Sequence, residues 1–170
     1  DRFANRAYTA RQRGYAQVLE TDHVYTPQMI VNGRIEFTGS NRKLASKAIL
    51  AALDVPVTAT VSLEAGRAKD NVVSVKYEVD APSGSGLSLA LVELKAESDV
   101  KRGENAGAKL THVNVVRGFQ SIDLAEGSSG SVELQLPKGL RPENARIIGY
   151  VQNTETQTVL GASKADLGKR

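Results

Sequence analysis

The spacing of apolar residues changes near residue 54, and the predicted secondary structure changes with it. Before this point, apolar residues recur at helical spacing in residues 6–19 and 41–53. After it, apolar and polar residues alternate, as in residues 57–63 and 73–79, which is typical of half-buried strands. The pattern therefore predicts a helix-containing N-terminal part and an all-β C-terminal part.

The two predicted helices each begin after a residue that can cap them. Asn5 precedes the first helix and Ser40 precedes the second, and both side chains can accept a hydrogen bond from a backbone amide of the first turn. In the second helix, Ala45, Ile49 and Leu53 form an apolar stripe. We expect this stripe to face the core.

A short hairpin is predicted between the two helices. Asn32-Gly33 separates the apolar residues 29–31 from residues 35–37. Asn-Gly between apolar runs is a strong hairpin signal, because both residues tolerate the positive φ angles of a tight turn. The N-terminal part should thus fold as helix, hairpin and helix.

Short strands separated by Gly, Pro and Ser turns are predicted after residue 54. Residues 87–94 are apolar on both faces, which favours a central strand. The full set of candidate strands is residues 57–63, 73–79, 87–94, 110–116, 119–124, 132–136, 145–151 and 158–162. This number of short strands favours an antiparallel β-sandwich over residues 55–170.

Composition excludes several classes of chemistry. The chain has no cysteine, so it forms no disulfide and offers no thiolate nucleophile or zinc ligand. Its two histidines, His23 and His112, lie far apart in sequence, and we expect neither a metal site nor a cofactor. The longest apolar run, residues 48–53, is too short to span a bilayer. Because the chain opens at Asp1, we interpret it as a piece of a longer precursor.

Positive charge is concentrated near the N-terminus. Residues 1–50 hold 8 Lys and Arg against 4 Asp and Glu, and the excess comes largely from Arg2, Arg6, Arg11 and Arg13. A nucleic-acid site would be expected to add aromatic side chains for base stacking, but aromatic residues are only 5% of this chain. We interpret the arginines as a solvated helix face and expect no nucleic-acid partner.

The N-terminal order of elements resembles the C-terminal half of a thioredoxin fold. In that fold a cis-proline begins a strand, and Tyr25-Thr26-Pro27 looks like this segment. The resemblance implies that the backbone at Thr26 faces an extended substrate. The alternative is an ordinary trans proline at the start of a strand.

Longer motifs extend the resemblance over most of the chain. Residues 8–16, 24–33, 102–107 and 110–117 together are similar to a bacterial family of secreted, thioredoxin-like proteins that contain a domain of unknown function. The resemblance implies a signal sequence, an extracytoplasmic location, a Cys-x-x-Cys motif and a C-terminal β-domain. This chain departs from the pattern, because the first part of the thioredoxin-like domain and its cysteines are absent.

The predicted fold class is therefore α+β. Residues 1–53 would be the C-terminal half of a thioredoxin-like domain, and residues 55–170 an antiparallel β-sandwich. Half a thioredoxin sheet would expose an apolar face and an unpaired edge. We expect the missing N-terminal part, or another chain, to complete that sheet, unless the segment is remodelled.

A polar cluster is predicted in the β-domain, around a glycine-containing loop and the strand that follows it. Alternation along this strand places His112 and Asn114 on one face and Val113 and Val115 on the other. Its function would be to bind a small anion or a peptide carboxylate. The alternative is a structural network that pins the loop. The members are Arg102, Glu104, Asn105, His112, Asn114 and Arg117.

Three functions are compatible with these observations. The first is a non-catalytic part of an extracytoplasmic thioredoxin-like protein, which binds or positions a peptide or protein partner through the β-domain. The second is the substrate-facing part of a thiol–disulfide oxidoreductase whose cysteines lie outside this chain. Without cysteine, this chain alone should have no redox activity. The third, a carbohydrate-binding or adhesion module, is disfavoured because the chain has no tryptophan to stack on sugars.

Overall fold

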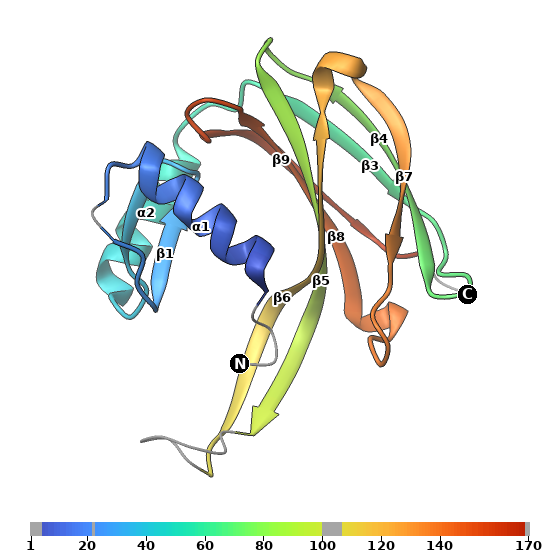
Figure 1. The fold of residues 1–170 in the computed structure, drawn as a ribbon, viewed down its shortest axis with the longest axis horizontal. Helices are drawn as coiled ribbons and strands as arrows, with labels where there is room; N and C mark the ends of the chain where they lie inside the picture. The colour runs from blue at the N-terminus through green and yellow to red at the C-terminus, as the bar shows by residue number, and fades with distance from the viewer. Residues whose placement is uncertain (1–4, 22, 100–106, 169–170) are drawn as a thin grey trace.

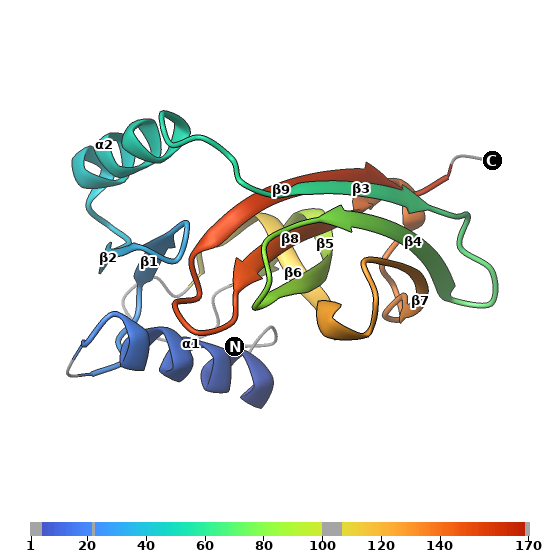
Figure 2. The same ribbon diagram turned by 90° about the horizontal axis from the view of Figure 1, so that it is seen from above.

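Two β-sheets packed face to face make up most of the molecule, with two α-helices and a small hairpin to one side (Figures 1 and 2). The computed structural model describes residues 5–21, 23–99 and 107–168. Neither α-helix within these residues has the length and apolarity that crossing a bilayer requires.

The first part of the chain forms a helix, a hairpin and a second helix. These elements are α1 (Arg6–Val18), β1 (Gln28–Val31), β2 (Ile35–Thr38) and α2 (Arg42–Leu53). The strands of the second part are β3 (Thr60–Ala65), β4 (Val72–Asp80), β5 (Ser85–Asp99), β6 (Lys109–Asp123), β7 (Ser129–Gln135), β8 (Ala145–Asn153) and β9 (Val159–Asp166). Two short 3-10 helices are η1 (Leu124–Glu126) and η2 (Pro142–Asn144).

The seven strands after α2 form two antiparallel sheets. One sheet has the order β3-β4-β7 and the other has the order β6-β5-β8-β9. The candidate strands at residues 110–116 and 119–124 are a single long strand, β6, with a register irregularity opposite Leu91 and Val92 of β5. Such an irregularity lets one long strand bend while it continues to pair.

A continuous apolar core fills the space between the two sheets. Leu87, Leu89 and Leu91 of β5 are completely buried, as are Val73 and Val75 of β4. Strand β5 pairs with β6 on one side and β8 on the other, and its residues 87–92 are buried on both faces. This confirms the central strand that apolar residues on both of its faces predicted.

The hairpin and α2 share a much smaller core. Val31, Phe37 and Ala48 are its buried residues. The α2 face that packs on the hairpin consists of alanines, namely Ala45, Ala48 and Ala52. Small side chains let the helix approach the strands closely. Of the predicted stripe, Ala45 packs on the hairpin, whereas Ile49 is 42% exposed and Leu53 75% exposed, so the stripe is wrong for these two residues.

Both α-helices have asparagine N-caps. Asn5 accepts a hydrogen bond from the amide of Ala7 at 2.9 Å, which confirms the predicted cap of α1. In α2 the cap is Asn41, which accepts from the amide of Leu44 at 3.0 Å, and not the predicted Ser40. Asparagine and serine cap helices about equally well, so the local pattern left a one-residue ambiguity.

The tip of the hairpin rests on the β8–β9 connection. Asn32 and Gly33 have φ angles of 50° and 67°, as the Asn-Gly pattern predicted. The amide of Val159 donates to the carbonyl of Asn32 at 3.0 Å. A Cβ at Gly33 would lie 2.0 Å from the carbonyl oxygen of Gln157, so only glycine permits this approach.

The predicted fold class is corrected by this architecture. The described residues contain nine strands and only two α-helices, so the fold is mainly β and not α+β. A thioredoxin-like helix–hairpin–helix segment is not evident, since β1 and β2 form a two-stranded sheet that pairs with no other described strand. The sequence pattern predicted the two helices and the hairpin individually. It did not predict how they assemble, because assembly depends on contacts between distant parts of the chain. The boundary between domains near residue 54 stays a prediction.

Candidate functional site

The Tyr25-Thr26-Pro27 segment enters the hairpin from α1. The Thr26–Pro27 peptide bond is cis, and both residues are exposed. The Tyr25 hydroxyl donates to Glu36 at 2.5 Å, and the Tyr25 carbonyl accepts from the Gln12 side chain at 3.1 Å. The substrate-facing role of this segment stays a prediction, as does the oxidoreductase function built on it.

The hydrogen bond between Tyr25 and Glu36 shifts both pKa values in opposite directions. Donation to the carboxylate raises the pKa of Tyr25 and lowers the pKa of Glu36. Gln28 also donates to this carboxylate, at 2.9 Å. These hydrogen bonds connect the Tyr25-Thr26-Pro27 segment and β1 to Glu36 of β2. Contacts within the hairpin region are sufficient to explain both pKa shifts.

His112 and Arg117, two described residues of the predicted polar cluster, bond to different side chains of β5. Arg102, Glu104 and Asn105 lie outside the described residues. Ser98 and His112 share a hydrogen bond of 2.7 Å, whereas Arg117 forms an ion pair with Glu93.

Asn114 has a positive φ of 51°, and Val113 and Val115 on either side of it keep one register against Lys95 and Glu93 of β5. Asn114 is exposed, and Val113, which was expected on the face opposite His112, is 72% exposed. The bonds of His112 and Arg117 cross from β6 to β5. They agree with the structural alternative for these two residues, and whether the six residues form a binding site stays a prediction.

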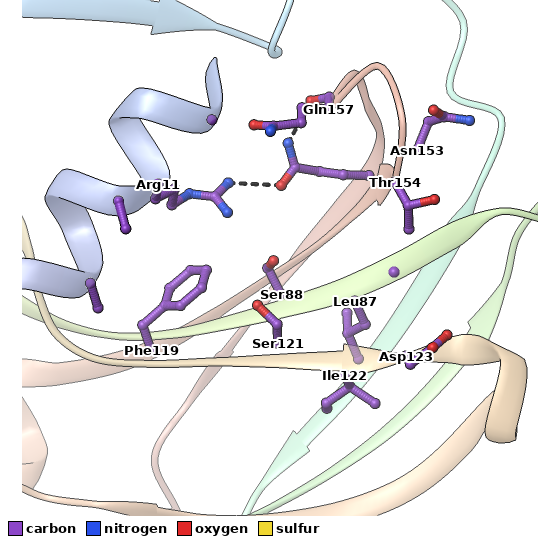
Figure 3. Close-up of a pocket in the computed structure, with 15 residues that line it drawn as sticks. Arg11, Leu87, Ser88, Phe119, Ser121, Ile122, Asp123, Asn153, Thr154 and Gln157 are labelled. Carbon is purple, nitrogen blue, oxygen red and sulfur yellow. Dashed lines mark hydrogen bonds between the residues drawn. The ribbon is translucent and has the colours of Figure 1, made fainter. Parts of the chain in front are cut away.

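A cleft of about 730 Å³ lies between α1 and the outer face of the four-stranded sheet (Figure 3). Helix α1 forms one wall, β5 and β6 form the floor, and β8 with the following turn closes the far side. The lining residues are Ala7, Ala10, Arg11, Gly14, Gly86, Leu87, Ser88, Phe119, Ser121, Ile122, Asp123, Gln152, Asn153, Thr154 and Gln157. Its size is in the range of small-molecule sites.

Arg11 projects from α1 into this cleft (Figure 3). Its guanidinium carbon lies 5.0 Å from the ring centres of Tyr15 and Phe119, and 5.4 Å from that of Tyr150. Cation–π contacts of this kind contribute on the order of 0.5–2 kcal/mol each. The three rings therefore hold the Arg11 charge in one place.

Arg11 donates only to neutral acceptors within the described residues. Its Nη2 donates to the Tyr15 hydroxyl at 2.8 Å and to Gln152 Oε1 at 2.7 Å. None of the ion pairs among these residues includes Arg11. A guanidinium carries five N–H groups, so the groups on Nε and Nη1 remain for other acceptors.

Gln152 connects the helix, the sheet and the β8–β9 turn. This side chain is buried, and its amide nitrogen donates to the Tyr15 hydroxyl at 2.7 Å and to the carbonyl of Gln157. With its oxygen bonded to Arg11, the amide is satisfied on both sides, as a buried polar group requires. Gln152 thus fixes the orientation of Arg11 relative to the sheet.

Tyr150 lies next to Gln152 on the same face of β8. Burial raises the pKa of Tyr150, and the nearby positive charge of Arg11 and a hydrogen bond with Ser88 partly oppose this rise. The Tyr150 hydroxyl therefore stays protonated near neutral pH. Ser88 is paired with Ser121 on one side and Tyr150 on the other, so hydroxyl groups form a row across the sheet.

Asp123 stands at the other end of the cleft, where β6 leads into η1 (Figure 3). Its Oδ1 accepts from the amide of Ala125 at 2.9 Å, which caps η1. A second pocket of about 560 Å³ begins here, since Asp123 and Thr154 line both cavities. Ser85, whose buried hydroxyl has no hydrogen-bond partner among the described residues, lines the second pocket.

The sequence pattern did not identify Arg11 as a site residue. Arg11 was interpreted as part of a solvated helix face, but it is partly buried against three aromatic rings. The exposed Arg13 fits the predicted solvated face. A signal was present in the helical spacing, because Arg11 is three residues after Tyr8 and four before Tyr15 and so shares their half-buried face.

No group of three or more His, Asp or Glu side chains in the described part of the chain is arranged to hold a metal ion. The chemistry available in the cleft is hydrogen bonding, one guanidinium, one carboxylate and apolar contact. This set can bind a ligand.

Comparison with known protein families shows which family the chain belongs to. Residues 1–152 match the family described as "Protein of unknown function (DUF1223)". The chain belongs to the DUF1223 family. This confirms the predicted membership in a family of unknown function. No curated protein matches the sequence.

Similarity to solved structures is weak. A DUF3823 family protein from Bacteroides ovatus is 14% identical, with a TM-score of 0.36 over 67% of this chain. Bacteroides uniformis beta-glucuronidase 2 is 15% identical, with a TM-score of 0.24 over 63% of this chain. The matched regions cover 58% and 12% of those two chains, respectively.

Proposed function

We propose that this chain is a non-catalytic binding part of an extracytoplasmic protein, and that the cleft between α1 and its β-domain binds a partner that carries a carboxylate group. The observation that supports the proposal is Arg11, a cation held in a cleft by three aromatic rings and in no ion pair with a described residue. Arginine is well suited to carboxylates because its planar group presents several donors at once.

The surroundings of Arg11 favour a carboxylate over a phosphate. Among the described residues that line the cleft, Arg11 is the only cation, and the lining also includes the carboxylate of Asp123. A doubly charged phosphate would have one guanidinium to balance two negative charges. A ligand with a single negative charge matches Arg11 alone. Phe119 and the methyl groups of Ala7, Ala10 and Thr154 supply apolar contacts for the rest of the ligand.

The proposal is tested by titrating the protein with the dipeptide alanyl-leucine and with its C-terminal amide, using isothermal calorimetry. The amide keeps the shape and the amino group but lacks the negative charge. We expect the dipeptide to bind at least ten-fold more tightly, since a hydrogen bond to a charged group contributes about 1.5–3 kcal/mol. Equal affinity for the two compounds would contradict the proposal.

Two substitutions on α1 provide the matched comparison. Arg11→Met keeps most of the apolar stem and removes the charge, and we expect it to abolish the preference for the free carboxylate. Arg13→Met makes the same change at an exposed position on the same helix and should leave affinity unaltered. If Arg11→Met lowers the melting temperature, Arg11→Lys, which keeps the charge, should retain part of the preference.

A further inference from the structure

Two opposite charges line the cleft at separate positions. Arg11 and Asp123 are the charged residues among those that line it, and Figure 3 shows them on opposite sides with Ser88 and Ser121 between them in this view. They form no ion pair with each other. A ligand in the cleft therefore meets a positive group at one end and a negative group at the other.

The register of the sheet sets the separation of these charges. Gly86 of β5 pairs with Asp123 of β6 on one side and with Gln152 of β8 on the other. Neighbouring strands are about 4.8 Å apart, so Asp123 and Gln152 are separated by roughly 10 Å. Arg11 is bonded to Gln152 at 2.7 Å, and Figure 3 shows it on the side of the cleft away from Asp123.

The middle position of the row, Gly86, lines the cleft, and the Thr154 methyl group borders it, 3.6 Å from where a Cβ would lie. Gly86 has no side chain, so nothing on β5 rises between Asp123 and Gln152 at this level of the sheet. The hydroxyl groups of Ser88 and Ser121 lie one pair further along the same face. They can donate to and accept from a peptide group placed over the glycine.

Asp123 is held in position by its cap on η1. Its Oδ1 accepts from the amide of Ala125, and within the described residues Asp123 takes part in no ion pair. The second carboxylate oxygen can accept from a cation while the cap stays intact. An ammonium group suits this place, because it is a compact donor with three N–H groups.

We infer that the cleft binds a zwitterionic peptide of about two residues, with its carboxylate at Arg11 and its amino group at Asp123. This inference rests on the proposed function. Subtracting charged hydrogen bonds of about 2.8 Å at each end from the separation of roughly 10 Å leaves roughly 4–5 Å between the ligand's own charges. An extended dipeptide spans at most about 7 Å, whereas one amino acid spans half of that.

The test measures the contribution of the ligand's amino group to affinity separately from that of its carboxylate. Alanyl-leucine and N-acetyl-alanyl-leucine both keep the carboxylate, but only the first carries a positive charge. We expect the free dipeptide to bind about ten-fold more tightly to the wild-type protein in calorimetric titrations. Equal binding of both compounds, each still tighter than the C-terminal amide, would overturn this inference and leave the proposed function standing. If the amide binds as well as the free dipeptide, the proposed function itself fails.

Asp123→Asn removes the charge and keeps an oxygen that can cap η1. The preference for the free amino group should disappear in this variant, while the preference for the free carboxylate remains. Asp54→Asn is the matched control, because Asp54 is an exposed residue at the C-terminal end of α2 outside the cleft, and it should retain both preferences. A preference for the free amino group that survives in Asp123→Asn would contradict the inference.

Ligand length gives an independent check. Free leucine should bind at least ten-fold more weakly than alanyl-leucine, because its two charges are too close together to reach both Arg11 and Asp123. Free leucine that binds as tightly as the dipeptide would show that the two residues do not act on one ligand, and would overturn the assignment.

Discussion

The β-sandwich and the helix–hairpin part of this chain are held together in different ways. Among the described residues, the sandwich core has fourteen buried residues, most of them from the strands of the two sheets, and its largest side chains are completely buried. The hairpin and α2 share three buried residues, and α2 leaves Leu50 and Leu53 largely exposed. Helix α1 has no buried residue at all and attaches through Arg11, Gln12 and Tyr15.

This difference explains where the cleft occurs. A rigid sheet provides the floor, and a helix attached mainly by polar and cation–π contacts provides the wall. The hydrogen bonds and cation–π contacts of α1 involve only a few of its side-chain atoms. Other atoms of the same side chains can therefore face a ligand in the cleft. Apolar burial stabilises the sandwich, and directional contacts position the site.

The largest effect should come from the sandwich core. Leu89→Ala deletes a completely buried side chain, and we expect it to lower the free energy of unfolding by about 3–5 kcal/mol because it leaves a cavity. Leu53→Ala is the matched change on α2, where the side chain is 75% exposed, and should cost no more than about 0.5 kcal/mol. Urea denaturation measures both. A similar loss for Leu53→Ala would show that the exposed α2 face is covered in solution.

The next effect should come from the contact between the hairpin and the sandwich. Gly33→Ala places a Cβ against the Gln157 carbonyl, at a position that already has a positive φ. We expect a loss of about 2 kcal/mol or more. The amide of Val159, which bonds to Asn32, should lose protection from hydrogen exchange while the amide of Leu89 keeps it.

Gly139→Ala is the control for this contact. Gly139 also has a positive φ, of 85°, but nothing lies within 4 Å of a Cβ placed there. It should therefore show only the conformational cost, about 1 kcal/mol, with normal exchange at Val159. Equal effects of the two substitutions would mean that the hairpin does not dock on the β8–β9 turn.

The smallest effect concerns pH and the junction between α1 and the sheet. Because burial raises the pKa of Tyr150 in the folded protein, the folded state favours the protonated hydroxyl. Its contribution to stability is fully present below the unfolded pKa of about 10 and is lost as pH rises through the folded value. In Tyr150→Phe, the decline of melting temperature above pH 10 should be shallower than in the wild type. An unchanged slope would contradict the assignment of this effect to Tyr150.

Several features of the fold could be predicted from the sequence because they depend on neighbouring residues. Asn5 caps α1 through an amide two residues away, and the turn at Asn32 and Gly33 follows from the φ angles that these residues tolerate. Alternation, and apolar residues on both faces of one segment, predicted the strands of the sandwich, including the central position of β5. In each case a local conformational preference was sufficient.

The prediction was wrong where packing overrides a local pattern. The apolar stripe of α2 pointed to Ile49 and Leu53, yet the alanine face packs on the hairpin because it allows a closer approach. The candidate strands at residues 110–116 and 119–124 are one strand, β6, because its register against β5 shifts opposite Leu91 and Val92 and the pairing continues beyond that shift. The α+β class failed for a similar reason, since the order of elements does not determine which of them assemble.

The amino-acid sequence by itself determined the helices, the hairpin turn, the strands and the absence of thiol chemistry, since each depends on residue type or on neighbours within a few positions. Only the tertiary structure decided that Arg11 lies in a cleft, because its partner Gln152 is 141 positions away. The position of Asp123 across the cleft from Arg11 depends on the register of β6 and β8 against Gly86 of β5. Such contacts arise from the packing of whole sheets, and no local pattern encodes them.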